Sequence, residues 1–277
     1  MSFCLKSLFA PKAIFYLLYS FMQPHLKITK EQISEYVLLP GDPGRVAVIG
    51  KFLSNFQMLS SNREFTIGTG EYKGKRITVC STGIGCPSTA IAVEELIAAG
   101  AKYLLRVGTC GGAWRSDIPA GSVIIPTATI RDEGTTVEYI PKEFPAVADY
   151  SLVTTLVQAA EQKQQQYFVG INRTHDAFYG NQNAITKWGK YLLEEKWKNN
   201  ETPILSSEME CAALFVIASL RGVKAGAILA VNSEPESLKE RIQGNQLAVQ
   251  TETSIDITER TVSSLIQIAL EGIYLLV

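Results

Sequence analysis

Three glycine-rich turns in the first half of the sequence carry residues that could bind an anion. They read GDPGR (41–45), TGIGCPS (82–88) and RVGTCGG (106–112), and each follows an apolar run. Glycine lets backbone N–H groups approach a ligand closely, and an arginine at the start of a helix adds a bidentate charged contact. The first turn is also typical of a tight turn with a surface arginine, and the second of an ordinary connection between a strand and a helix.

Arg106, in the third turn, is the strongest single signal because it interrupts an apolar strand. A charge at such a position needs a partner, which is either a buried carboxylate or an anionic ligand. The sequence has no GxxxxGK[ST] motif and no GxGxxG motif after a strand, which are the fingerprints of nucleotide binding. These absences favour free phosphate as the anion.

The segment SEMECAA (207–213) supplies two glutamates on either side of a methionine at the start of an apolar helix. Acidic residues stabilise a helix N-terminus through its dipole, which alone would explain Glu208 and Glu210. The same three residues would also suit a sugar. Carboxylates accept hydrogen bonds from vicinal hydroxyls, and the thioether of Met209 packs against an apolar ring face.

Composition narrows the possible functions. Lys and Arg total 26, Asp and Glu total 27, and the formal net charge is −1, so the chain offers no basic field for nucleic acid or an anionic membrane. The two histidines and five cysteines show no zinc-binding spacing. Scattered cysteines are typical of reduced thiols in the cytoplasm. Catalysis must therefore use arginines, carboxylates, amides and the backbone.

The elements that must position these groups alternate along the chain. Apolar, β-branched runs predict strands at 36–40, 76–81, 103–107, 122–126, 167–172 and 225–231. Helical patterns occupy 88–99, 151–163, 184–198, 210–221 and 255–275. This alternation predicts an α/β fold with a largely parallel or mixed sheet, in which ligands gather at the carboxyl ends of strands.

Residues 1–22 form a separate segment with two lysines and an apolar run over 13–22. The run is too short for a membrane span and lacks a cleavage site of the secretory type. A secretory signal and an interfacial helix remain alternatives. We expect an appendage at 1–22, no membrane span, and one domain over 23–277.

Several motifs, taken in order, resemble the nucleoside phosphorylase family of the purine and uridine type. They are GDPGR (41–45), NREF (62–65), CSTGIGCPS (80–88), AVEEL (92–96), LRVGTCGG (105–112), EFPAVAD (143–149), DAFYG (176–180) and SEMECAALF (207–215). CSTGIGCPS followed by AVEEL points to the uridine branch. The resemblance implies a single-domain fold with a central mixed β-sheet, partly barrel-like and flanked by helices.

The resemblance also implies roles for individual residues. It assigns phosphate binding to Gly41, Arg45, Arg106, Thr109 and, from a neighbouring subunit, Arg63. It assigns ribose binding to Glu208, Met209, Glu210 and the neighbour's His25. Base binding falls to Phe178 and Gln182. A potassium ion between subunits would be held at Glu64, Ile84 and Ser88.

The implied reaction is the phosphorolysis of a nucleoside to a free base and ribose 1-phosphate, with Arg106, Glu210 and Gln182 as catalytic residues. Its sugar passes through an oxocarbenium-like state, as in glycoside cleavage, with phosphate as the nucleophile. Phosphate is already an anion at neutral pH, so no histidine base is required. The resemblance further implies no organic cofactor and a cytoplasmic homo-oligomer, either a dimer or a hexamer built as a trimer of dimers.

Two departures concern the base. Uridine phosphorylases commonly carry an arginine two residues after the base-binding glutamine and another after the Val-Asn pair of a late strand. Here those positions are Ala184 and Ser233. Glu234, one residue after Ser233, could supply an acidic side chain to the base from a position displaced by one residue, or it could be an ordinary loop residue. Replacement donors could come from Arg173, Lys187 or Arg241.

The leading hypothesis is therefore a phosphorylase for uridine or a related pyrimidine nucleoside. The missing arginines motivate a purine nucleoside or methylthioadenosine phosphorylase as the nearest rival. A nucleosidase would leave Arg45 and Arg106 without an anion. A non-catalytic nucleoside-binding protein is the alternative from a different class.

Overall fold

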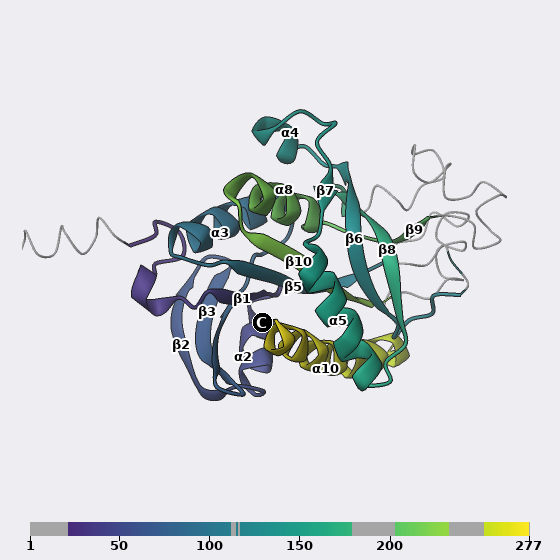
Figure 1. The fold of residues 1–277 in the computed structure, drawn as a ribbon, viewed down its shortest axis with the longest axis horizontal. Helices are drawn as coiled ribbons and strands as arrows, with labels where there is room; N and C mark the ends of the chain where they lie inside the picture. Colours follow the sequence, from purple (N-terminus) through teal and green to yellow (C-terminus); the bar gives the residue numbers. More distant parts are fainter. Residues whose placement is uncertain (1–21, 112–114, 116, 179–202, 233–251, 277) are drawn as a thin grey trace, which may run out of the picture.

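The central feature of the fold is a mixed β-sheet with helices on both faces (Figure 1). The structure, a computed structural model, describes residues 22–111, 115, 117–178, 203–232 and 252–276, with the backbone alone for 252–258. Its ten strands in these ranges are β1 (Tyr36–Leu39), β2 (Ser54–Asn62), β3 (Phe65–Tyr72), β4 (Lys75–Cys80), β5 (Tyr103–Cys110), β6 (Val123–Asp132), β7 (Ala146–Val147), β8 (Tyr167–His175), β9 (Ile204–Glu208) and β10 (Lys224–Val231).

The sheet combines two sets of parallel strands with antiparallel pairs. The order is β2-β3-β4-β1-β5-β10-β6-β8-β9, with β7 paired to β6. Strands β4, β1, β5 and β10 run parallel to one another, and so do β6, β8 and β9. The β10–β6 pair and the β2–β3–β4 meander are antiparallel. The predicted mixed sheet is confirmed.

Strand β9, at the end of the sheet order, contacts β5 in the middle of the sheet. Gly111 and Ser207 form an antiparallel bridge in which the Ser207 N–H donates to the Gly111 carbonyl at 2.8 Å and the Gly111 N–H donates back at 2.9 Å. The bridge joins the end of β9 to the end of β5, so the half of the sheet from β5 to β9 curls towards closure. This curvature confirms the partly barrel-like fold and brings Glu208 next to β5.

The helices in the described residues cover both faces of the sheet. They are α2 (Gly44–Gly50), α3 (Cys86–Ala98), α4 (Thr136–Tyr139), α5 (Tyr150–Gln162), α8 (Cys211–Arg221) and α10 (Glu252–Leu275), with a 3-10 helix η1 (Lys30–Gln32). Local sequence explains several ends. Asp149 caps α5 by accepting from the Ser151 N–H at 2.9 Å, Pro87 lies in the first turn of α3, and α8 stops at Gly222 with φ of 69°.

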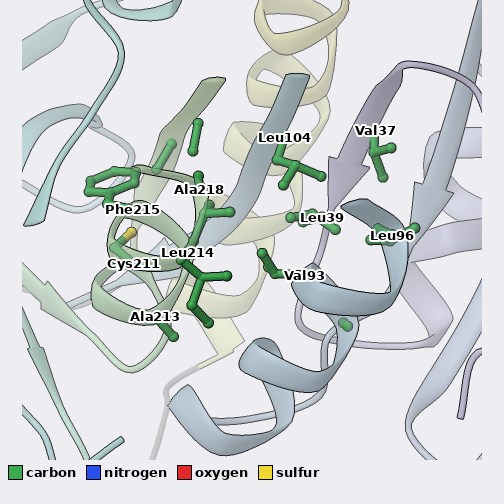
Figure 2. Close-up of a cluster of buried hydrophobic side chains, with 14 of the residues drawn as sticks. Val37, Leu39, Val93, Leu96, Leu104, Cys211, Ala213, Leu214, Phe215 and Ala218 are labelled. Carbon is green, nitrogen blue, oxygen red and sulfur yellow. The ribbon is translucent and has the colours of Figure 1, made fainter. Parts of the chain in front are cut away.

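Two hydrophobic clusters hold the layers together. Figure 2 shows the first, in which Val93 and Leu96 of α3 and Leu214 and Phe215 of α8 pack beside Leu104 of β5. The second lies on the opposite face, against α5 and α10, and contains Leu105. Successive side chains of a strand point to opposite faces, so Arg106 shares the face of Leu104 and points towards α8.

Most elements expected from the sequence are present. The six predicted strands correspond to β1, β4, β5, β6, β8 and β10, and four predicted helices correspond to α3, α5, α8 and α10. The helix expected at 184–198 and the segment 1–21 lie outside the described residues. The helix expected to start at Arg45 corresponds to α2, whereas the sequence interpretation did not include β2, β3, β7, β9 or α4. Among the helices of the described residues, none combines the length and apolarity that a membrane crossing requires.

Candidate active site

The three glycine-rich turns of the sequence meet at the carboxyl end of β5. The first two are hydrogen-bonded to each other, because the Gly83 N–H donates to the Gly41 carbonyl at 3.0 Å and the Thr82 N–H donates to the Pro40 carbonyl at 2.9 Å. The helices α2 and α3 begin within these two turns, at Gly44 and Cys86. Helix N-termini present free N–H groups and the positive end of the helix dipole, so this corner favours an anion.

Arg106 lies at the centre of this corner with 5% of its surface exposed. Its Nε is 2.9 Å from Glu208 Oε2 and its Nη2 is 2.5 Å from Glu210 Oε2. Burial alone would lower the pKa of Arg106, but the charges of Glu210 and Glu208 raise it above its ordinary value. The guanidinium is therefore permanently charged and fixed between two carboxylates.

The remaining donor of this guanidinium points at the first glycine turn. Arg106 Nη1 is buried and has no hydrogen-bond partner among the described residues, and Nε, although 2.9 Å from Glu208 Oε2, forms an ion pair there without the geometry of a hydrogen bond. A Cβ atom built on Gly41 would lie 3.9 Å from this Nη1 and 3.3 Å from the Gly83 carbonyl oxygen. A buried donor without a partner is costly, so the geometry is that of a site awaiting an acceptor. An anion lying over the Gly41 turn would supply it.

Arg45 adds a second positive charge from the first turn of α2. Its side chain is half-buried, and no described residue forms an ion pair or hydrogen bond with it. Burial lowers the pKa of Arg45, with the nearby charge of Asp42 opposing and that of Arg106 adding to the effect. Repulsion between two close guanidinium groups is relieved when an anion binds between them. Thr109, half-buried on β5, lies at the same end of the sheet.

The two glutamates differ in their surroundings and in their protonation. Burial would raise the pKa of Glu208, but Arg106 and hydrogen bonds from Thr174 and the backbone bring it below the ordinary value. Burial raises the pKa of Glu210 despite Arg106, and the charge of Glu208 raises it further. Glu208 is thus a fixed carboxylate, whereas Glu210 is the member of the pair that takes up a proton more readily.

Gly108 makes room for the folded-back guanidinium. A Cβ atom at this position would lie 2.7 Å from Arg106 Cζ and 2.8 Å from Nη2. We expect Gly108→Ala to displace the guanidinium, to raise the KM for phosphate strongly and to cost about 1–3 kcal/mol of stability through overpacking. Steady-state kinetics with phosphate varied and thermal unfolding measure the two effects.

Gly134→Ala is the matched control for this prediction. A Cβ atom at Gly134 would meet Asp176 Oδ2 at an ordinary 3.6 Å, so this variant tests a glycine-to-alanine change without a steric clash. An unaltered KM for phosphate in Gly108→Ala would contradict the close packing of this glycine against Arg106.

Known proteins share this architecture over most of the chain. The family model described as "Phosphorylase superfamily" matches residues 35–267. A uridine phosphorylase of Treponema pallidum is 41% identical over 91% of this chain and 93% of its own length. A guanosine phosphorylase of Halorubrum lacusprofundi is 37% identical over 84% and 90%. A crystal structure of uridine phosphorylase from Vibrio fischeri superposes with a TM-score of 0.78 at 32% identity, covering 91% of this chain and 96% of that one.

The chain belongs to the phosphorylase superfamily. The fold and the nucleoside phosphorylase resemblance expected from the sequence are thereby confirmed.

The ribose and base residues that the superfamily resemblance implies are described in part. Met209 is half-buried between Glu208 and Glu210, and its carbonyl accepts a hydrogen bond from Cys86 Sγ at 3.3 Å. Phe178 follows β8 and is 63% exposed. Gln182 lies outside the described residues, and so do Ala184, Lys187, Ser233, Glu234 and Arg241. Arg173, a possible replacement donor, is bound to Asp132 Oδ2 through Nε at 3.0 Å and Nη2 at 2.5 Å.

The residues expected to act at a neighbouring subunit lie together at a corner that adjoins the second glycine turn. The carbonyl of His25 accepts from Asn62 Nδ2 at 2.7 Å, and the next residue, Arg63, is exposed in the β2–β3 turn. Glu64 follows, and its Oε1 accepts from Ser88 Oγ at 2.7 Å. That hydrogen bond is the main cause of the lowered pKa of Glu64. Ile84 is 80% exposed between two glycines of the second turn.

Glu95 anchors this corner, and the sequence interpretation gave it no role. Its carboxylate accepts from the backbone N–H groups of His25 at 3.1 Å and Leu26 at 2.9 Å, and it lies 2.5 Å from His25 Nδ1. Bound there, Nδ1 leaves the opposite ring nitrogen, Nε2, for a ligand. The sequence did contain a signal for this role. Glu95 is a charged residue on the apolar face of the helix predicted at 88–99, where Val93 and Leu96 are core residues.

We expect Glu95→Ala to destabilise the fold. The change leaves two backbone N–H groups without an acceptor, at a cost of about 1–3 kcal/mol. At about 2–4 °C per kcal/mol for a chain of this size, thermal unfolding would resolve the loss. Glu94→Ala is the control, because Glu94 pairs with Arg221 at 2.7 Å on the surface and its loss should matter little. Equal melting temperatures for the two variants would refute the anchoring role of Glu95.

Proposed function

We propose that this chain catalyses the reversible phosphorolysis of a nucleoside, with uridine as the preferred substrate, to give the free base and ribose 1-phosphate. The observation that carries the proposal is the buried Arg106, held by two carboxylates, with Nη1 unpartnered among the described residues and directed at the Gly41 turn. The superfamily membership and the named uridine phosphorylases among its relatives support the same reaction. The enzyme is a pentosyltransferase.

The proposed mechanism needs no side-chain nucleophile. Phosphate binds over the turns at Gly41 and Gly83, beside Arg45, Arg106 and Thr109. One phosphate oxygen attacks C1′ of the ribose, the bond from C1′ to the base nitrogen breaks, and its electron pair leaves with the base. The protein contributes by placing phosphate below C1′ and by stabilising the charge that develops on sugar and base. On the base side, Phe178 would stack on the ring and Gln182 would donate to its edge.

Glu210 and Met209 are the residues proposed to bind the ribose. Glu210 Oε1 accepts from the Gly85 N–H at 2.6 Å, Oε2 forms the ion pair with Arg106, and the Met209 backbone also hydrogen-bonds to this carboxylate. A carboxylate has about four acceptor directions, so Glu210 retains acceptor capacity for a sugar hydroxyl. The same carboxylate thus connects the phosphate-binding arginine to the sugar that phosphate attacks.

We further propose a cytoplasmic homo-oligomer, a dimer or a trimer of dimers, in which His25 and Arg63 complete a neighbour's site. Their position together on one corner, with His25 side chain 41% exposed, supports this assignment. A potassium ion prefers oxygen ligands, and Glu64, Ser88 and the turn at Ile84 carry oxygen atoms. A potassium site at these residues therefore stays a prediction. The described cysteines (Cys80, Cys86, Cys110 and Cys211) are free and buried, which agrees with a reducing compartment.

A purine nucleoside is the second candidate substrate. The positions of both base-side arginines hold Ala184 and Ser233, and one relative is named a guanosine phosphorylase. The phosphate and ribose parts of the proposed mechanism are the same for either base.

A substrate panel tests the proposal. Uridine, inosine, adenosine and methylthioadenosine are each incubated with the purified protein, with and without inorganic phosphate, and base and ribose 1-phosphate are quantified. We expect uracil release only in the presence of phosphate, with one ribose 1-phosphate per uracil. Inert uridine beside rapid inosine turnover would establish the purine alternative. Base release at the same rate without phosphate, or nucleoside binding without any release, would overturn phosphorolysis.

A further inference from the structure

We propose that Glu208 is a positioning residue which holds Arg106 for phosphate and does not bind the ribose. The resemblance to known phosphorylases groups Glu208 with the sugar ligands, but its surroundings in this chain differ from those of a ligand-binding carboxylate. The inference rests on the proposed function for the identity of the two ligands.

The oxygens of Glu208 are fully occupied by the protein. Oε1 accepts from Thr174 Oγ1 at 2.7 Å and from Asn172 Nδ2 at 3.0 Å. Oε2 accepts from the backbone N–H groups of Glu210 at 2.8 Å and Cys211 at 2.9 Å, and it also contacts Arg106 Nε at 2.9 Å. A carboxylate has about four acceptor directions. With 2% of its side chain exposed, Glu208 has no acceptor left to offer a sugar hydroxyl.

Glu208 is held in turn by a second set of polar groups. Asn172 Oδ1 accepts from Ser206 Oγ at 2.9 Å, and Thr174 Oγ1 lies 2.9 Å from Thr129 Oγ1. Thr174 Oγ1 also accepts from the Ala212 N–H at 3.1 Å. These residues come from β6, β8, β9 and α8. The carboxylate itself is bound by β8, the start of α8 and Arg106 of β5, so it cannot turn towards a ligand without breaking several buried hydrogen bonds, each of which is costly to leave unmade.

The contacts therefore give the two glutamates different roles. Glu208 forms an ion pair on the Nε side of Arg106 and accepts hydrogen bonds from the start of α8, whereas Glu210 contacts Nη2 and keeps acceptor capacity for a ligand. Loss of Glu208 should misplace the guanidinium and weaken phosphate binding. It should leave recognition of the ribose hydroxyls unchanged, because Glu208 contributes no acceptor to them.

Glu208→Gln, which keeps the shape and removes the charge, tests this division. Inorganic phosphate binding is measured by calorimetry, and kcat/KM is measured separately for phosphate, uridine and 2′-deoxyuridine. We expect weaker phosphate binding, a loss of about 100-fold in kcat/KM for phosphate, and an unchanged preference for uridine over 2′-deoxyuridine. Glu210→Gln is the comparison variant, and we expect it to reduce that preference. A reduced preference in Glu208→Gln would overturn the proposal, and so would unchanged phosphate affinity.

A second pair of variants tests the positioning role of Glu208 if Glu208→Gln does not fold. Thr174→Val removes the hydroxyl that donates to Glu208 Oε1, and Thr174→Ser keeps it. We expect Thr174→Val to weaken phosphate binding without changing the preference for the 2′-hydroxyl, and Thr174→Ser to restore phosphate affinity. Equal phosphate affinity in Thr174→Val and Thr174→Ser would count against the proposal.

Failure of the proposed function gives a different result from failure of this inference. If the unaltered protein binds phosphate but releases no base, phosphorolysis is wrong. The phosphate affinities of the Glu208 and Thr174 variants still decide the positioning role in that case.

Discussion

Arg106→Ala is expected to lose phosphate-dependent turnover almost completely. The arginine is the buried cation at the meeting point of the glycine turns, and its Nη1 has no partner among the described residues. Removal of one well-placed donor to a developing charge typically costs 10²–10³-fold in rate. Because this variant removes several donors and the charge, we expect a loss of about 1,000-fold or more in kcat/KM for phosphate, which corresponds to about 4 kcal/mol. Base release at saturating uridine with phosphate varied is the measurement.

The same substitution leaves Glu208 and Glu210 buried without their cation, so a folding defect must be separated from a catalytic one. Breaking a buried ion pair by removing one partner costs about 3–5 kcal/mol. Arg106→Lys retains the charge but lacks the fork that engages two carboxylates and a ligand together. We expect it to recover stability and to remain severely impaired towards phosphate. Arg221→Ala, which breaks a surface pair with Glu94, is the control. Near-normal activity in Arg106→Ala would refute the site.

Arg106 also illustrates what sequence reasoning could determine about the site. A charge within an apolar strand left two interpretations open, a buried carboxylate partner or an anionic ligand. The structure contains both features on one side chain, since two donors face Glu208 and Glu210 while Nη1 faces the Gly41 turn. Neither interpretation excluded the other, because a guanidinium has five donors in a fixed plane. The partners themselves are about a hundred residues away in sequence, and only the fold brings them together.

The strands that the sequence interpretation missed have physical causes as well. In β3, Gly68 and Gly70 weaken the strand pattern, but a Cβ atom at Gly68 would lie 2.4 Å from the ring of Phe56. The glycine is required by the aromatic ring packed on it, which no local pattern reveals. Strand β9 was missed because it is short and ends in Ser206, Ser207 and Glu208, all buried. Their burial depends on hydrogen-bond partners from other strands, so a hydrophobic pattern was absent.

Helices and parallel strands were predicted more successfully because their signals are local. The runs that became β5 and β10 are apolar and β-branched, as expected of strands covered on both faces. The start of α3 was indicated by its proline and the preceding glycine turn. The anchoring residues Glu95 and Thr174 were not predicted, because their importance comes from tertiary contacts to His25 and Glu208.

Glu210→Gln is expected to produce the second large loss, this time in the use of the nucleoside. The carboxylate of Glu210 contacts Arg106 Nη2 and retains acceptor capacity for a ribose hydroxyl. A hydrogen bond to a charged group contributes about 1.5–3 kcal/mol, so we expect kcat/KM for uridine to fall by about 10- to 150-fold. The variant keeps the size of the side chain, and thermal unfolding checks that the fold is retained.

The raised pKa of Glu210 also predicts how kcat/KM for uridine depends on pH. Burial, together with the charge of Glu208, raises the pKa of Glu210 above that of an ordinary glutamate even though Arg106 opposes the shift. A raised pKa means that the carboxylate takes up a proton at a higher pH than usual as the solution is acidified. Because the neutral acid cannot act as the charged acceptor, kcat/KM for uridine should fall on the acidic side, starting above the pH at which an ordinary glutamate titrates. Glu210→Gln cannot titrate and should lack this decline.

The ratio of the two pH profiles isolates the contribution of Glu210, because the titration of phosphate itself is common to both proteins and cancels. Activity of the unaltered enzyme should approach that of Glu210→Gln at low pH and exceed it increasingly as the pH rises through the pKa of Glu210. Glu94→Gln, on the surface pair with Arg221, should follow the profile of the unaltered enzyme throughout. A ratio that does not change with pH would mean that the ionised form of Glu210 makes no contribution to catalysis, and the sugar-binding role would then fall to Met209 and the neighbouring subunit.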